Sequence, residues 1–100
     1  NLGRYSLATG VQADERVSGF SIFPNPFQDN FKIVLELSKP MVGKITLTDV
    51  LGRQLKVVWD GPLSIGRVAI PVSFPDVPAG LYTCTLQVEG STLYTKVVKY

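Results

Sequence analysis

The stretch from Gly80 to Lys99, GLYTCTLQVEGSTLYTKVVK, decides the fold of this 100-residue chain. Every second side chain from Tyr82 to Val88 is apolar, which is the period of a half-buried β-strand. Glu89-Gly90 then supplies a turn signal, and a second run rich in β-branched residues follows it. The stretch therefore predicts a β-hairpin and, with it, a β-rich domain.

The rest of the chain shows the same rhythm of strands and turns. In residues 31–37 every second side chain is apolar, from Phe31 to Leu37, and both charged side chains fall on the other face, whereas a helix would scatter the four apolar ones. Pro24 and Pro26 end the first strand, and Pro71 suits an edge strand or the exit from a strand, because proline lacks the N–H that a central ladder needs. Five strands are predicted before the hairpin, at residues 20–23, 31–37, 44–50, 54–59 and 67–74, with a loop at 60–66.

About seven strands, with turn signals every eight to twelve residues or so, predict an all-β fold of the immunoglobulin-like antiparallel β-sandwich type. A small barrel is the alternative, and the sequence leaves the order of the strands in space open. We expect Ile45 and Leu47 to point inward. We also expect Leu55, Val57 and Trp59 to share one side of their strand, with Trp59 in the core.

Composition and charge argue against several classes of protein. The net charge is +2, and no basic run marks a binder of nucleic acid or of anionic membranes. No apolar stretch approaches the ~18 residues of a transmembrane span. The chain lacks an initiator Met and the apolar core of a signal peptide, so we expect it to be a piece of a longer protein.

The domain boundary is predicted near residue 19. Residues 1–18 are predicted to be a linker or the tail of an upstream domain, because small and charged residues dominate its second half. A weak alternation at residues 4–8 suggests one short strand within it. Residues 19–100 are predicted to form one folded domain.

Residues that carry catalysis or bind metals are few. The chain has no His, and its single Cys84 lies in the apolar phase of its strand, where we expect a buried thiol. No Gly-rich phosphate loop is present. We therefore predict no enzyme activity, no cofactor and no metal site. Four aspartates stand beside turn residues and are predicted to close turns rather than to bind calcium, namely Asp29, Asp49, Asp60 and Asp76.

One further turn is predicted at Val77-Pro78-Ala79-Gly80-Leu81-Tyr82. A Tyr a few residues beyond a Pro/Gly turn can hydrogen-bond back to that turn, as in the tyrosine corner of β-sandwiches. We expect the Tyr82 hydroxyl to make this bond. Gly80 in this turn and Gly52 in the turn at 51–53 are predicted to need positive φ.

Four sequence blocks occur in the order found in a known family. They are Phe20-Ser21-Ile22-Phe23-Pro24-Asn25-Pro26, Asp49-Val50-Leu51-Gly52-Arg53-Gln54, Pro78-Ala79-Gly80-Leu81-Tyr82 and Lys96-Val97-Val98-Lys99. In this order they resemble the "YPNP" block, the "D-x-x-G-R-x" turn, the "x-x-G-x-Y" block and the terminal lysine-containing strand of one family. That family is the C-terminal sorting domain of the type IX (Por) secretion system of Bacteroidota. The resemblance covers residues 19–100, with Phe23 in place of the commoner Tyr and Tyr100 one residue beyond the usual ending.

The resemblance implies a targeting role. Such domains are carried by exported cargo proteins, follow a Sec signal peptide into the periplasm, and direct transport across the outer membrane through the type IX translocon. In many, a sortase-like cysteine peptidase then removes the domain and joins the cargo to an anionic lipopolysaccharide, and the cut would fall within residues 9–18. Recognition is expected to centre on the last hairpin, at Gly80, Tyr82, Lys96 and Lys99.

Two other functions stay open on the residues alone. A fibronectin III or immunoglobulin-like adhesion or carbohydrate-binding accessory module would present exposed aromatic rings, for which Tyr94 and Tyr100 are the candidates. A structural scaffold without a partner is the third possibility. The position of the domain within the native protein would separate the first of these from a sorting domain.

Overall fold

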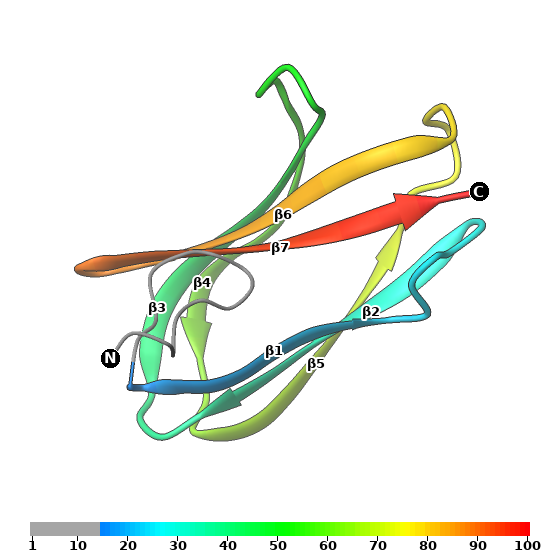
Figure 1. The fold of residues 1–100 in the computed structure, drawn as a ribbon. Coiled ribbons are helices and arrows are strands. Elements are labelled where there is room, and N and C mark those ends of the chain that lie inside the picture. The colour runs from blue at the N-terminus through cyan, green and yellow to red at the C-terminus, as the bar shows by residue number, and fades with distance from the viewer. Residues whose placement is uncertain (1–14) are drawn as a thin grey trace, which may run out of the picture.

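The structure, a computed structural model, describes residues 15–100 as seven β-strands, and this part of the chain holds no helix that could span a membrane (Figure 1). The strands are β1 (Val17–Phe23), β2 (Asn30–Leu37), β3 (Met41–Thr48), β4 (Gln54–Leu63), β5 (Gly66–Ser73), β6 (Gly80–Val88) and β7 (Ser91–Lys99). The predicted all-β fold is confirmed. The strand predicted at residues 4–8 and most of the predicted linker lie outside the described residues, and β1 begins within the linker range, at Val17.

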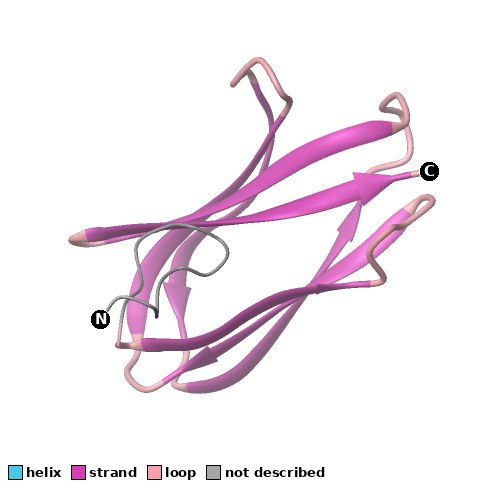
Figure 2. Cartoon of the chain, viewed as in Figure 1, coloured by secondary structure: helices cyan, strands magenta, loops and turns pink. Residues whose placement is uncertain are grey.

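The strands form two antiparallel sheets that pack face to face (Figure 2). The smaller sheet has the order β1-β2-β5 and the larger the order β4-β3-β6-β7, so the chain crosses between sheets after β2, after β4 and after β5. The immunoglobulin-like sandwich is thereby confirmed. In a constant-type immunoglobulin domain the fourth strand joins the sheet of the first, whereas here β4 pairs with β3 in the opposite sheet.

The core lies between the sheets and is built by alternation along each strand. Phe31, Ile33, Leu35 and Leu37 of β2 are all buried, as predicted, and Ile45 and Leu47 of β3 face them from the other sheet. Burying one such side chain contributes about 1.5–3 kcal/mol. The hairpin of β6 and β7 closes this core with five fully or nearly fully buried side chains, Tyr82, Cys84, Leu86, Val88 and Val97.

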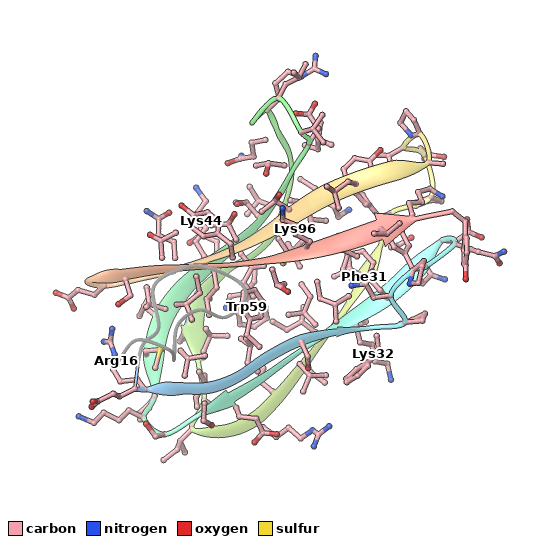
Figure 3. The ribbon with its side chains drawn as sticks, in the orientation of Figure 1. Arg16, Phe31, Lys32, Lys44, Trp59 and Lys96 are labelled. Carbon is pink, nitrogen blue, oxygen red and sulfur yellow. The ribbon has the colours of Figure 1, made fainter. Side chains whose placement is uncertain are left out.

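The prediction for β4 is wrong for two of its three apolar side chains. Leu55 and Val57 are 42% and 43% exposed, whereas Trp59 packs against the core. The register against β3 shifts, because Ile45 pairs with Trp59 but the next residue, Thr46, pairs with Val57. An extra residue in one strand reverses the alternation beyond it, so Trp59 points inward and Val57 outward. Figure 3 shows Trp59 between the two sheets.

The predicted loop at 60–66 is also wrong over most of its length. β4 continues to Leu63, which is buried, and β5 begins at Gly66. Pro62 pairs with Val42 in this extension. β4 is an edge strand, where one side of the backbone needs no ladder bond, so the missing N–H of Pro62 is tolerated. The same reasoning predicted an edge or exit position for Pro71, and the structure places it in β5, the edge strand of the smaller sheet.

Candidate functional site

The turn between β3 and β4 is closed by the Asp49 carboxylate. Its Oδ1 accepts hydrogen bonds from the backbone N–H of Leu51 at 2.9 Å and of Arg53 at 3.0 Å, and its Oδ2 accepts one from Arg53 Nε at 2.8 Å. The backbone bond from Arg53 is the main reason why the pKa of Asp49 lies below its ordinary value. The predicted turn role of Asp49 is confirmed, as is the positive φ of Gly52, at 85°. The fixed turn holds Val50 and Leu51 in solvent, 72% and 74% exposed.

The turn into β6 is closed by a tyrosine corner, as predicted. The Tyr82 hydroxyl donates to the carbonyl oxygen of Pro78, and the ring packs edge-on against Phe74 with centroids 5.4 Å apart. Gly80 has φ of 151°, a conformation that side-chain-bearing residues rarely adopt. Tyr82 is only 5% exposed, so its ring shapes the turn from inside.

These two turns, far apart in sequence, form the walls of one surface groove. The groove has a volume of about 460 Å³ and continues into a second hollow of about 540 Å³ on the outer face of the larger sheet. The two hollows share Asp49, Val50 and Leu81. We call their union the outer groove. Its remaining lining residues are Thr48, Leu51, Gly52, Arg53, Leu55, Val77, Pro78, Ala79, Gly80, Tyr82, Thr83, Thr85, Tyr94 and Lys96.

Lys96 lies on the floor of the outer groove. It pairs with Thr83 of β6, and alternation along β7 puts its side chain outward because the next residue, Val97, is fully buried. Figure 3 shows Lys96 and Lys44 on the side of the larger sheet that faces away from the core, whereas Phe31 lies between the sheets. The exposed ring of Tyr94 stands two residues before Lys96 on the same face.

Lys99 lies elsewhere. Its Nζ donates to the carbonyl oxygen of Gln28 and stands 5.6 Å from the centroid of the Phe27 ring, at the end of the sandwich. The structure therefore brings Gly80, Tyr82 and Lys96 together around the outer groove, with Tyr82 as part of its inner wall, and keeps Lys99 outside it.

Sequence reasoning missed Asn25 and Phe27, which hold the terminal strand. The Asn25 carboxamide donates to the carbonyl of Lys96 at 3.0 Å and accepts from the N–H of Val98 at 2.9 Å. Phe27 is buried against Phe31, with centroids 4.7 Å apart. The one available signal was an apolar Phe27 in an otherwise polar turn after two prolines.

The groups able to carry covalent or metal chemistry are limited in residues 15–100. Cys84 is fully buried, as predicted, and its burial raises the pKa of the thiol to about 12. Among the described residues no three His, Cys, Asp or Glu side chains come together to hold a metal ion. The described surface offers the outer groove, with an apolar rim and a lysine, and a separate apolar hollow of about 510 Å³ on the smaller sheet, lined by Phe23, Lys32 and Pro71 among others.

The fold and this surface define a β-sandwich module with a preformed groove built from separate turns. The family model described as "Secretion system C-terminal sorting domain" matches residues 21–100. The comparisons with curated proteins and with solved structures returned no match. The chain belongs to the family of secretion system C-terminal sorting domains, which confirms the resemblance drawn from its sequence blocks.

The family match also decides between the functions left open by the sequence. The domain is the C-terminal sorting signal for type IX secretion, and nothing supports the adhesion or carbohydrate-binding alternative. Such a signal implies interaction with the type IX secretion machinery and a protein destined for the cell surface or the outside. A sorting-signal domain is generally not catalytic.

Proposed function

We propose that the type IX translocon recognises this domain in its folded β-sandwich form and that the outer groove is the surface it contacts. The single observation that supports this most strongly is the meeting of two of the family-like sequence blocks, the turn at 49–54 and the turn at 78–82, as walls of one groove. These blocks are about thirty residues apart in sequence, so an extended chain would not present them together.

The chemistry of the groove suits a protein partner. Val50, Leu81 and Tyr94 are exposed apolar side chains around it, and contiguous exposed apolar surface marks interaction sites in soluble proteins. Lys96 adds a positive charge whose natural complement is an acidic side chain on the partner, and such pairs set specificity and the rate of encounter. The partner surface we propose is therefore apolar with an acidic group opposite Lys96.

The four predicted recognition residues have three different roles in this proposal. Lys96 acts by direct contact with the translocon. Gly80 and Tyr82 act by holding the wall of the groove in shape, since Tyr82 is tied to Pro78. Lys99 acts through the seating of β7, since its ammonium group bonds to the Gln28 carbonyl.

We further propose the fate of the domain after recognition. The protein passes through the periplasm, and a sortase-like cysteine peptidase cuts within residues 9–18 and joins the cargo to an anionic lipopolysaccharide. The family resemblance supports this sequence of events, and the polar composition of the segment suits protease access. Because Val17 and Ser18 belong to β1, we place the cut before residue 17.

A reporter fusion tests the sorting function. Residues 9–100 are fused to the C-terminus of a fluorescent or enzymatic reporter behind a Sec signal peptide, in a host with an active type IX system. We expect the reporter at the cell surface or in the medium, without residues of the sandwich, and in the periplasm when the host lacks the translocon. Retention of the intact fusion in the periplasm of the competent host would contradict the proposal.

A further inference from the structure

The end of β7 is held on both of its edges. On one edge it pairs with β6, with Gly80 opposite Lys99. On the other, Phe27 forms a parallel bridge with Lys99: the N–H of Phe27 donates to the Val98 carbonyl at 2.9 Å, and the N–H of Tyr100 donates to the Phe27 carbonyl at 3.0 Å. The segment that follows β1 thus covers part of an edge that would otherwise be open to pairing.

Asn25 extends this bridge by one step with its side chain. A carboxamide carries the donor and the acceptor of a peptide group, and here it binds the carbonyl of Lys96 and the N–H of Val98. Its neighbours Pro24 and Pro26 have no N–H to offer. The Asn25 side chain therefore makes the ladder bonds that the backbone at this point does not supply.

β7 takes its register from its pairing with β6, and the bonds from Asn25 hold the end of β7 in that register. They hold the backbone of Lys96 and Val98, and between these two residues Val97 enters the core with no exposed surface. A slip of one residue in a strand moves every side chain to the opposite face. Asn25 thus supports the backbone that orients Lys96 without lining the outer groove.

Lys99 adds to the same contact from the β7 side. Its ammonium group bonds to the Gln28 carbonyl and stands over the Phe27 ring, where a cation is attracted by the ring face. Phe27 is itself buried, so this contact ties β7 to the core as well as to the turn. We call Asn25, Phe27 and Lys99 the terminal latch.

We propose that Asn25 is a positioning residue of the sorting signal. The contacts of the terminal latch must be formed for Lys96 to point outward into the outer groove. The link to sorting rests on the proposed function of the groove. The latch itself rests only on contacts within the domain, so the two are tested separately.

Hydrogen exchange followed by NMR on the isolated domain tests the latch. Asn25→Ala removes both side-chain bonds, and Asn30→Ala is the matched control, because Asn30 is exposed and its side chain makes no hydrogen bond within residues 15–100. We expect the amides of Val98 and Tyr100 to exchange at least about tenfold faster in Asn25→Ala, with a much smaller change at Leu86. Unchanged exchange at Val98 and Tyr100, or equal acceleration at all three amides, would overturn the latch.

The reporter fusion then tests the link to sorting, at a temperature where melting curves show each variant folded. We expect Asn25→Ala to lose most of its export and Asn30→Ala to keep it. Normal export of a variant with an open latch would overturn the positioning role. If Asn25→Ala fails to export while Lys96→Glu exports normally, the outer groove fails as the contact surface but the latch stands as part of the signal.

Discussion

The hydroxyl of Tyr82 donates a hydrogen bond to the carbonyl oxygen of Pro78, four residues earlier in the chain. This bond closes the turn that leads into β6, and the Tyr82 ring fills the core beside Phe74. The outer face of the same turn is a wall of the outer groove. The segment from Pro78 to Tyr82 therefore stabilises the core on its inner side and forms part of the proposed contact surface on its outer side.

Removing this hydroxyl should weaken the fold by a definite amount. Tyr82→Phe keeps the ring but leaves the Pro78 carbonyl without its partner, and we expect the free energy of unfolding to fall by about 0.5–1.5 kcal/mol. Chemical denaturation measures the change. Tyr94→Phe, at an exposed site, is the matched control and should change stability by less than about 0.5 kcal/mol. Equal effects of the two substitutions would contradict the assigned bond.

Gly80 should resist replacement because of its backbone alone. A Cβ at this position would meet no atom within 4 Å, so space is not limiting, but φ of 151° disfavours any side chain. We expect Gly80→Val to lower the free energy of unfolding by at least about 1 kcal/mol. Ala79→Val, at the exposed neighbouring residue, should cost less. An unchanged melting curve for Gly80→Val would refute the conformational requirement.

Cys84 should be inert in the folded domain. With a pKa of about 12, only roughly one thiol in ten thousand is ionised at pH 8, and the thiolate is the reactive form. We expect iodoacetamide to leave the native domain unlabelled for hours and to label it rapidly in denaturant, as read by mass spectrometry. Fast labelling of the native protein would show that β6 opens or that the thiol is not buried.

Acid should weaken the turn that Asp49 closes. Its pKa in the folded domain lies below the ordinary value of 3.8, so the stabilisation is present above that value and is lost as the pH falls through the folded pKa. The stability difference between the wild type and Asp49→Asn should therefore be constant from about pH 7 to pH 5 and shrink below about pH 4. Urea denaturation across this range measures it. A constant difference down to pH 2 would rule out the charged carboxylate as the cause.

The period-2 pattern predicted the strands well where one strand pairs regularly with its neighbours. β2 is the clearest example, since its apolar face is buried from Phe31 to Leu37. The pattern failed at β4, because the two register shifts against β3 change which side chains face inward. A bulge depends on the partner strand, and the sequence of one strand does not contain that information.

The residues of the candidate site also differ in how well the sequence predicts their roles. The roles of Asp49, Gly52 and Tyr82 were predictable because each acts within a turn of a few residues. Asn25 was not, because its partners Lys96 and Val98 lie 71 and 73 residues away along the chain. Hydrogen bonds within a short turn can be predicted from the local sequence. A side chain that takes the place of a peptide group beside a distant strand can be predicted only once the strand topology is known.

The most direct test of the outer groove is a pair of charge reversals in the reporter fusion. Lys96→Glu changes the groove, whereas Lys32→Glu makes the same change at an exposed residue of β2, in the sheet that does not contribute to the groove. With both variants folded, we predict that surface delivery falls by at least about tenfold for Lys96→Glu, because the reversed charge would repel the acidic group proposed opposite it. Lys32→Glu should match the wild type. Equal delivery of the two variants would contradict recognition through the outer groove.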